Sequence, residues 1–185
     1  MNASERRRAV FFDRDGTLIR DVGYVGTPEL VDLLPGAAAA VRRLNDAGWL
    51  AIVVTNQSGI ARDFLTEDDY RRVNARFRDL MAEGGGRIDA DYHCPHHPDY
   101  TGACACRKPG TELFERAAAD WNVDIGTSAF IGDRWRDVEP SLILGGRGVL
   151  VPGKRTPDEE IARARTDGEV VGSVPEAVDR MLHGE

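Results

Sequence analysis

The sequence is poor in cysteine, has no long apolar run and has no excess of positive charge. Its three cysteines among 185 residues are too few for a disulfide scaffold, and an odd number cannot all pair. No window approaches the roughly 18 consecutive apolar residues of a membrane-spanning helix. The apolar stretch that follows the basic N-terminal residues, Ala9–Phe12, is too short for the core of a signal peptide. These absences predict a cytoplasmic protein with no membrane partner.

Acidic residues outnumber basic ones, 31 to 24, which gives a net charge of −7. Such a balance argues against nucleic acid or an anionic membrane held by bulk charge. An anionic ligand would therefore need positive charge placed locally. The content of hydrophobic residues, 42%, and of charged residues, 30%, is ordinary for a globular protein. At roughly 150 residues per domain, we expect residues 1–185 to form one domain, and we expect a monomer.

Short apolar runs alternate with helical patterns along most of the chain. Strands are predicted at 9–12, 51–54, 129–131, 148–151 and 169–171. Helices are predicted at 35–47, 66–83, 111–121, 157–165 and 174–182. This alternation predicts an α/β fold, a Rossmann-like three-layer α/β/α sandwich around a mainly parallel sheet. Ligands bind such sheets at the carboxyl ends of the strands.

Two acidic residues follow the first predicted strand. Asp13 and Asp15 belong to the run DRDGT, in which one residue separates the carboxylates and a glycine allows the chain to turn. Two such carboxylates at a strand end can hold a divalent cation and present one oxygen as a nucleophile. Taken alone, these five residues fit a solvated acidic turn equally well.

Three further polar segments lie next to predicted elements. Thr55 begins the run TNQSG at the end of the second strand, where a hydroxyl can donate to a phosphate oxygen. Arg107 and Lys108 precede a helix start, where they could neutralise an anion. Asp133 follows the third predicted strand, and Asp137 lies four residues later, as further metal ligands. Each segment alone is a common surface feature, a plain turn or a solvated charged group.

In their order along the chain, these segments resemble the four motifs of the haloacid dehalogenase-like phosphatases. The resemblance implies that Asp13 attacks phosphorus to form an aspartyl-phosphate, and that Asp15 protonates the leaving alkoxide and then activates water. It also implies that Mg²⁺ is bound by the side chains of Asp13 and Asp133 and by the backbone carbonyl of Asp15, with Asp137 behind them.

The same resemblance implies that Thr55 and Lys108 hold the phosphoryl oxygens. Nearby positive charge is needed, because a carboxylate and a phosphate dianion repel each other.

All three cysteines fall within thirteen residues. Cys94 and His96 form a Cys-x-His, and seven residues separate it from the Cys-x-Cys of Cys104 and Cys106. Three thiolates and an imidazole suit a closed tetrahedral Zn²⁺ site of structural type. The alternative, unpaired surface thiols, is disfavoured by the clustering. We therefore expect a small zinc-binding loop at about 93–109.

The fourth zinc ligand is open at this point, because His93 or His97 could replace His96. The loop ends next to Arg107 and Lys108, so zinc would hold the segment that carries these two cations.

The runs HCPHHP, CACRKP and VVTNQSGIAR, with DVGYV at 21–25, narrow the resemblance to the heptose-bisphosphate phosphatase branch. The likeness runs from about residue 10 to residue 151. It implies the absence of a large cap domain and removal of the 7-phosphate of D-glycero-D-manno-heptose 1,7-bisphosphate, in the synthesis of nucleotide-activated heptose. Contacts to this phosphorylated sugar are implied for Asp21, Val22, Gly23, Tyr24, Thr55, Asn56, Gln57, Ser58, Arg107, Lys108 and Arg134.

Three alternatives remain. Histidinol-phosphate phosphatases share the catalytic set and the zinc pattern, but tend to carry Asp-Gly-Leu-Gly where this chain has SGIA at 58–61. A receiver-type signalling domain also has a phospho-accepting Asp, a Thr and a Lys, but its acidic pair lies on the first strand and the accepting Asp comes later. The third alternative is a zinc-containing binding module without catalysis.

Overall fold

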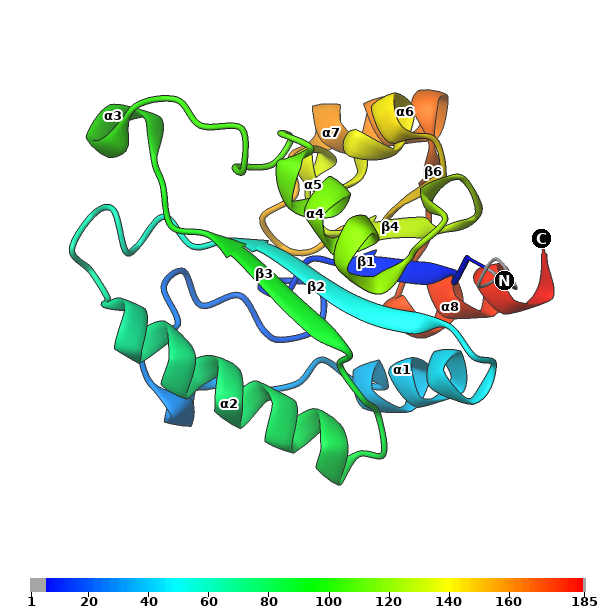
Figure 1. Cartoon of the computed structure of the whole chain (residues 1–185), viewed down its shortest axis with the longest axis horizontal. Coiled ribbons are helices and arrows are strands. Elements are labelled where there is room, and N and C mark those ends of the chain that lie inside the picture. The colour runs from blue at the N-terminus through cyan, green and yellow to red at the C-terminus, as the bar shows by residue number, and fades with distance from the viewer. Residues whose placement is uncertain (1–5, 185) are drawn as a thin grey trace, which may run out of the picture.

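The computed structural model describes residues 6–184, so the two ends of the predicted domain, 1–5 and 185, lie outside the described residues. Within this range six parallel strands form one sheet in the order β3-β2-β1-β4-β5-β6 (Figure 1). The strands are β1 (Ala9–Phe12), β2 (Leu50–Asn56), β3 (Ala90–Cys94), β4 (Ala129–Gly132), β5 (Arg147–Leu150) and β6 (Glu169–Val170). The predicted α/β fold with a parallel sheet is confirmed.

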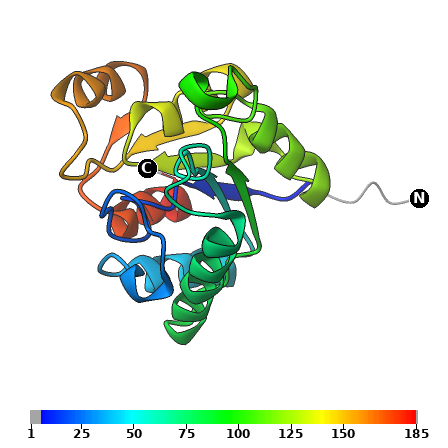
Figure 2. The same cartoon turned by 90° about the vertical axis from the view of Figure 1, so that its left-hand side faces the viewer.

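Helices cover both faces of the sheet, as Figures 1 and 2 show. One face carries α1 (Ala37–Asp46), α2 (Glu67–Glu83) and α8 (Val174–His183). The other carries α4 (Glu112–Trp121), α5 (Trp135–Val138), α6 (Pro140–Leu144) and α7 (Asp158–Asp167). Among residues 6–184, no helix has both the length and the apolar character that crossing a bilayer requires.

Each predicted strand and helix is present, with ends displaced by no more than two residues. Local signals explain this agreement. At the start of α2, the Thr66 hydroxyl accepts a hydrogen bond from the Asp69 amide at 3.1 Å, while Asp69 Oδ2 accepts from the Thr66 amide at 2.8 Å. This reciprocal pair satisfies two backbone donors that the helix itself leaves free. At the end of α4, Asn122 takes the left-handed conformation that stops a helix.

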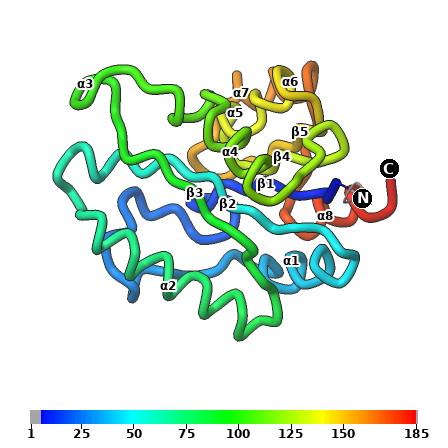
Figure 3. Tube along the Cα trace, in the orientation of Figure 1, coloured from blue at the N-terminus to red at the C-terminus, as the bar shows by residue number. Residues whose placement is uncertain are grey.

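Elements that the sequence patterns did not predict are short or polar. β3 carries Asp91 and His93 and lies at the sheet edge, so it lacks the apolar run of the central strands. The loop predicted at about 93–109 therefore begins within a strand, and it contains the short helix α3 (Pro98–Thr101). Figure 3 shows the chain running from β3 out to α3 and returning to α4. The short helices α5 and α6 were likewise not predicted.

The central strand β1 packs into both layers. Val10 and Phe12 contact the core under α1, α2 and α8, whereas Phe11 points to the opposite layer. There the rings of Phe11, Phe114 and Phe130 lie 5.0–5.5 Å apart between centroids. A strand covered on both faces is apolar at every position, which is why a continuous run rather than an alternating one predicted it.

The strand order places the functional segments together. β1 lies between β2 and β4, so the chain changes direction across the sheet at this point. In such sheets a crevice forms between the loops that leave the carboxyl ends of the two neighbouring strands. Asp13 follows β1, Asn56 ends β2 and Asp133 follows β4. Segments far apart in sequence therefore meet at one edge of the sheet.

The aromatic cluster gives a test of this packing. We expect Phe114→Ala to lower the free energy of unfolding by about 3–5 kcal/mol, because it leaves a cavity between two other rings. Ile143→Ala, at a side chain that is 69% exposed, should change it by about 0.5 kcal/mol or less. Urea denaturation of both variants measures the difference, and equal losses would contradict the assigned core.

Candidate active site and metal centre

Three buried carboxylates meet at the carboxyl edge of the sheet. Asp13, Asp133 and Asp137 each offer an oxygen within 4.8 Å of the others. Burial, followed by the charges of Asp13 and Asp137, raises the pKa of Asp133 to about 8. Burial also raises the pKa of Asp13 to about 6, even though Lys108 opposes the shift. Without a further cation, the protein cannot keep all three groups ionised at neutral pH.

Lys108 supplies part of the compensating charge. Its ammonium group donates to Asp13 Oδ1 at 2.7 Å and to the Val54 carbonyl at 2.6 Å, and lies 2.8 Å from Asp137 Oδ1. Burial alone would lower the pKa of Lys108, but the two carboxylates raise it above its ordinary value. Lys108 is therefore a buried cation that keeps Asp13 ionised.

Two glycines allow the carboxylates to approach the backbone. Gly16 has a φ of +95°, and a Cβ at this position would lie 2.6 Å from Asp133 Oδ2. A Cβ at Gly132 would lie 2.2 Å from the Cβ of Asp137. Any larger residue would displace the acidic side chain, so these glycines make room for the cluster.

The cluster suits a hard divalent cation. Carboxylate oxygens are the ligands that Mg²⁺ prefers, and the glycine-lined approach leaves these oxygens close together. Asp13 and Asp133 face an open cavity, whereas Asp137 lies behind them against Lys108. A cation bound on the cavity side of the cluster could therefore also contact a molecule that occupies the cavity.

Asp15 is held beside this cluster by two neighbours. Gln57 Nε2 donates to Asp15 Oδ2 at 2.7 Å and to the Thr55 hydroxyl at 3.0 Å. The fully buried Arg14 pairs with the same carboxylate at 3.0 Å, and its guanidinium lies over the ring of Tyr70. The Asp15 side chain remains 20% exposed, so its position is fixed while it stays open to the cavity.

A cavity of about 260 Å³ lies above these groups. It brings together most of the residues that the sequence assigned to the site, namely Asp13, Asp15, Asp21, Gly23, Tyr24, Thr55, Asn56, Gln57, Ser58, Arg107, Asp133 and Arg134. Val22 is 44% exposed and does not line the cavity, and Lys108 lies beneath it. The lining also includes Gly59, Arg136 and Arg155, which sequence reasoning missed.

Arg136 and Arg155, which the sequence analysis did not assign to the site, differ in how far the sequence could have revealed them. Arg136 lies two residues after Arg134 in the run DRWRD, so its position could have been suspected from the sequence. Arg155 comes from the loop after β5 and pairs with Asp21 at 3.3 Å, a contact between segments that no pattern links.

Asn56 contacts the cavity and also positions Lys108. Its amide nitrogen donates to the Lys108 carbonyl at 3.2 Å, and its amide oxygen accepts from the Lys108 backbone N–H at 3.0 Å. This pair of bonds joins the end of β2 to the loop that carries the cation.

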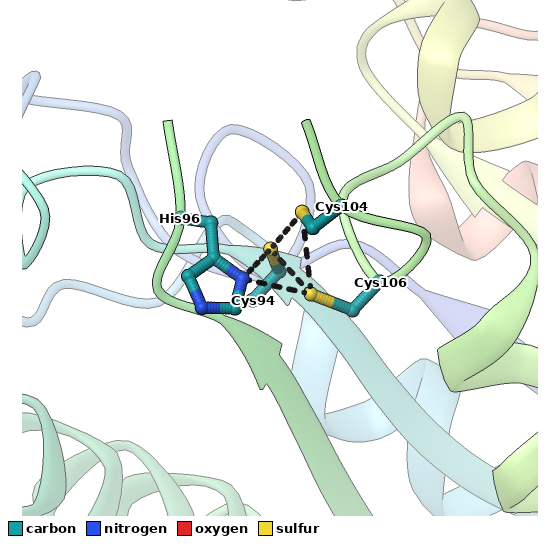
Figure 4. Close-up of side chains that lie close together, drawn as sticks. All are labelled: Cys94, His96, Cys104 and Cys106. Carbon is teal, nitrogen blue, oxygen red and sulfur yellow. Dashed lines mark hydrogen bonds between the residues drawn. The ribbon is translucent and has the colours of Figure 1, made fainter. Parts of the chain in front are cut away.

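The three cysteines and one histidine form a cluster where the loop that carries Lys108 lies next to the end of β3. Figure 4 shows the thiol groups of Cys94, Cys104 and Cys106 and the ring of His96 pointing toward one another. The three Sγ atoms and a ring nitrogen of His96 all lie within 4.8 Å of one another, and His96 Nδ1 lies 3.2 Å from Cys106 Sγ and 3.8 Å from Cys94 Sγ. Three sulfurs and one ring nitrogen in such a group could hold a metal ion with a preference for soft ligands.

The structure settles which histidine joins the cluster. His93 Nε2 lies 3.1 Å from Glu67, and the His93 ring packs on Tyr70. His97 Nε2 lies 2.7 Å from a guanidinium nitrogen of Arg62. His96 is therefore the histidine that belongs to the group.

The cysteine cluster and the cavity are connected through Arg107. This residue directly follows Cys106, and its Nη1 donates to the His96 carbonyl at 3.1 Å. The loop that carries Arg107 and Lys108 is thus anchored by the cysteine cluster on one side and by Asn56 on the other.

The chain is similar to known proteins. The HAD-hydrolase-like family model matches residues 105–177. The D-glycero-beta-D-manno-heptose-1,7-bisphosphate 7-phosphatase of Rhodopseudomonas palustris is 41% identical over 164 residues, which cover 86% of this chain and 88% of the relative. The corresponding D-glycero-D-manno-heptose enzyme of Thermosynechococcus vestitus is 42% identical over 154 residues, or 78% and 79% of the two chains.

A solved structure is also similar. The D,D-heptose 1,7-bisphosphate phosphatase from B. bronchiseptica, crystallised with magnesium and phosphate, superposes with a TM-score of 0.85 at 28% identity. The match covers 96% of this chain and 99% of that chain.

The raised pKa values of the carboxylates predict how stability depends on pH. Between the ordinary pKa of 3.8 and the raised values of about 6 for Asp13 and about 8 for Asp133, the metal-free folded protein binds more protons than the unfolded chain. The contribution of these two carboxylates to stability is therefore fully present below about pH 4 and is lost as pH rises through this window. We expect the Tm of magnesium-free protein to fall between about pH 5 and 8, and added Mg²⁺ to raise it most at the upper end.

Asp133→Asn is the matched variant. It removes the group with the most strongly raised pKa, so its Tm should depend less on pH and respond less to Mg²⁺. Calorimetry of both proteins across this pH range measures the effect. An identical slope for the two proteins would contradict the assignment.

Proposed function

The chain belongs to the heptose-1,7-bisphosphate 7-phosphatases, a branch of the haloacid dehalogenase-like hydrolases, and we propose that it removes the 7-phosphate of D-glycero-D-manno-heptose 1,7-bisphosphate. One observation carries the proposal. Asp13 faces the cavity beside Asp15, and the buried Lys108 holds Asp13 ionised from behind. A carboxylate so held can act as a nucleophile toward phosphorus.

In the proposed reaction, an Asp13 oxygen attacks phosphorus and the bond to the sugar oxygen breaks. Asp15 donates a proton to the leaving oxygen, and then takes a proton from the water that hydrolyses the aspartyl-phosphate. Gln57 and Arg14 keep the Asp15 carboxyl in place for both proton transfers. Mg²⁺, when bound by Asp13, the Asp15 carbonyl and Asp133, would neutralise phosphoryl charge and orient that group.

The sugar is proposed to contact the residues that line the cavity opposite the carboxylates. The loop that carries Asp21, Gly23 and Tyr24 forms one wall, and the segment 55–58 forms another. Their mixture of hydroxyl, amide and aromatic groups suits a polyhydroxylated ligand. The proposed product enters the synthesis of nucleotide-activated heptose, and we expect the enzyme to act as a cytoplasmic monomer.

Zn²⁺ is the ion that we propose for the cysteine cluster. Four ligands of this kind leave no position for a substrate, which is typical of a structural site. Burial raises the pKa of the Cys94 and Cys106 thiols; burial acts on Cys104 as well, but hydrogen bonds from Cys106, the Arg107 backbone and Cys94 outweigh it and lower the pKa of Cys104 to about 7. A metal ion bound by all three sulfurs would therefore have to displace the protons of Cys94 and Cys106. The proposed role of the ion is to fix the loop that delivers Arg107 and Lys108.

The nucleophile is tested by Asp13→Asn. We expect phosphate release from the heptose bisphosphate to fall at least about a thousandfold, because the amide cannot form the acyl-phosphate. Circular dichroism and zinc content should stay at the wild-type level. Substantial phosphate release by this variant would reject Asp13 as the nucleophile.

The substrate is tested by a panel assay. Wild-type protein should hydrolyse either anomer of the heptose bisphosphate with a higher kcat/KM than histidinol phosphate or simple sugar phosphates. Turnover of histidinol phosphate at least as efficient as that of the heptose bisphosphate would reject this choice of substrate, while leaving the phosphatase chemistry in place.

The zinc site is tested by Cys104→Ser. We expect loss of bound zinc and a fall in Tm of about 5 °C or more, because the loop loses its anchor. Activity at the usual assay temperature should fall as a consequence. When it is measured below the Tm of the variant, kcat/KM should be closer to the wild-type value. Metal analysis and calorimetry provide the measurements, and an unchanged Tm would show that the cluster does not stabilise the loop.

A further inference from the structure

Arg14 is a buried cation that hydrogen bonds hold at one nitrogen only. Its side chain is fully buried, and Nη2 donates to Asp15 Oδ2 at 3.0 Å and to Asp15 Oδ1 at 3.2 Å. Nε and Nη1 are also buried but have no hydrogen-bond partner. A planar guanidinium that is bonded through a single nitrogen can still turn about that nitrogen. The contact with Asp15 therefore does not by itself determine how the plane of the guanidinium lies.

The aromatic ring of Tyr70 restricts this motion. The Cζ atom of Arg14 lies over the ring, 5.3 Å from its centroid. The electron-rich face of an aromatic ring attracts a guanidinium, and the attraction is strongest away from water. Tyr70 is only 3% exposed, so the contact is shielded from solvent and the ring favours one placement of the Arg14 side chain.

The hydroxyl of Tyr70 is not what attracts Arg14. It is buried and has no hydrogen-bond partner among the described residues. Burial raises the pKa of Tyr70 above its ordinary value, so the hydroxyl keeps its proton at neutral pH. The guanidinium therefore interacts with the face of a neutral ring and not with a phenolate. A phenylalanine at this position would offer the same face.

Tyr70 is itself held by contacts between α2 and β3. The rings of Tyr70 and His93 lie 4.0 Å apart between centroids, with an angle of 33° between their planes. His93 Nε2 also lies 3.1 Å from Glu67. Glu67 and Tyr70 are three residues apart on α2, so they share one face of the helix, and both contact His93. The Tyr70 ring is thus fixed to the edge strand independently of Arg14.

We propose that Tyr70 is a positioning residue for the proton transfers of Asp15. Its ring fixes the plane of the Arg14 guanidinium, and Arg14 in turn orients the Asp15 carboxyl toward the leaving oxygen. Gln57 bonds to only one of the two Asp15 oxygens, Oδ2, so it does not set this orientation alone. The inference rests on the proposed function, in which Asp15 protonates the sugar oxygen.

The experiment compares two kinds of leaving group. The sugar oxygen of D-glycero-D-manno-heptose 1,7-bisphosphate leaves as a poor alkoxide unless an acid protonates it, whereas the oxygen of 2,4-dinitrophenyl phosphate leaves as a stable anion. In the proposed reaction, kcat/KM covers the steps up to departure of this oxygen. It therefore measures Asp15 as an acid, and not its later action on water.

The proteins are wild type, Tyr70→Leu, Tyr70→Phe and the control Phe77→Leu. Phe77 is another buried ring of α2 and belongs to the apolar core, so its variant matches the loss of a ring from this helix. Calorimetry gives the Tm of each protein, and the assays are run at a temperature at which all are folded. Tyr70→Met, which fills more of the space, takes the place of Tyr70→Leu if that variant does not fold.

We expect Tyr70→Leu to lower kcat/KM for the heptose bisphosphate about ten- to hundredfold, because the acid is no longer held in line with the leaving oxygen. For 2,4-dinitrophenyl phosphate, kcat/KM should change by less than about threefold, since its leaving group needs no proton. Tyr70→Phe should stay within about threefold of wild type with both substrates, because the ring face is kept. Phe77→Leu should leave the ratio of the two kcat/KM values unchanged.

Four results would overturn the inference. Equal losses on both substrates in Tyr70→Leu would mean that the ring supports the site or the fold as a whole. Unchanged activity on both would mean that Asp15 does not need the ring. A selective loss in Tyr70→Phe would assign the effect to the hydroxyl, and the same selective loss in Phe77→Leu would show that any lost ring of α2 produces it.

Failure of the proposed function has a different signature, because wild-type protein would then not hydrolyse the heptose bisphosphate. Crystal structures of Tyr70→Leu and Tyr70→Phe test the inference in that case as well. The distance from Arg14 Nη2 to Asp15 should exceed hydrogen-bond range in Tyr70→Leu and stay near the wild-type 3.0 Å in Tyr70→Phe. An unmoved pair in Tyr70→Leu would overturn the inference without reference to any activity.

Discussion

Uncompensated negative charge at the carboxyl edge of the sheet is the constraint on which the rest of this structure depends. Three buried carboxylates meet there, and a single ammonium group, that of Lys108, is buried among them. One cation cannot balance three anions in a place with little water, so protons or a metal ion must complete the balance. The same imbalance would destabilise the protein without a cation and would favour the binding of a divalent one.

The position of Lys108 links the other special features of the chain. Its backbone is held by the Asn56 side chain at the end of β2. Two residues before it, Cys106 belongs to the cysteine cluster at the end of β3. A loop without regular structure can place a buried cation only if its ends are fixed, because an unanchored loop would lose conformational entropy each time the charge is buried. The cysteine cluster therefore helps to fix the position of Lys108 from outside the cavity.

Much of the fold was predictable because it depends on local signals. The central strands are apolar at every position, and helices such as α2 begin with capping residues that the sequence displays directly. The edge strand β3 was not predictable in this way. It is paired on one side only, and its polar residues Asp91 and His93 pair with Arg78 and Glu67, while Cys94 at its end belongs to the cysteine cluster. Its strand conformation depends on pairing with β2, a contact between distant segments that no local pattern records.

The sequence by itself determined the parallel α/β architecture, the acidic pair, the polar segments at the strand ends and the set of candidate metal ligands, because these follow from short runs of residue types. Only the tertiary structure decided which members of each set act together. In the folded chain His96, and not His93 or His97, lies with the cysteines. Arg134 pairs with Glu160, whereas Arg136 lines the cavity. Residues so close in sequence differ only in the direction of their side chains, and that direction is set by backbone conformation and by packing partners from distant segments.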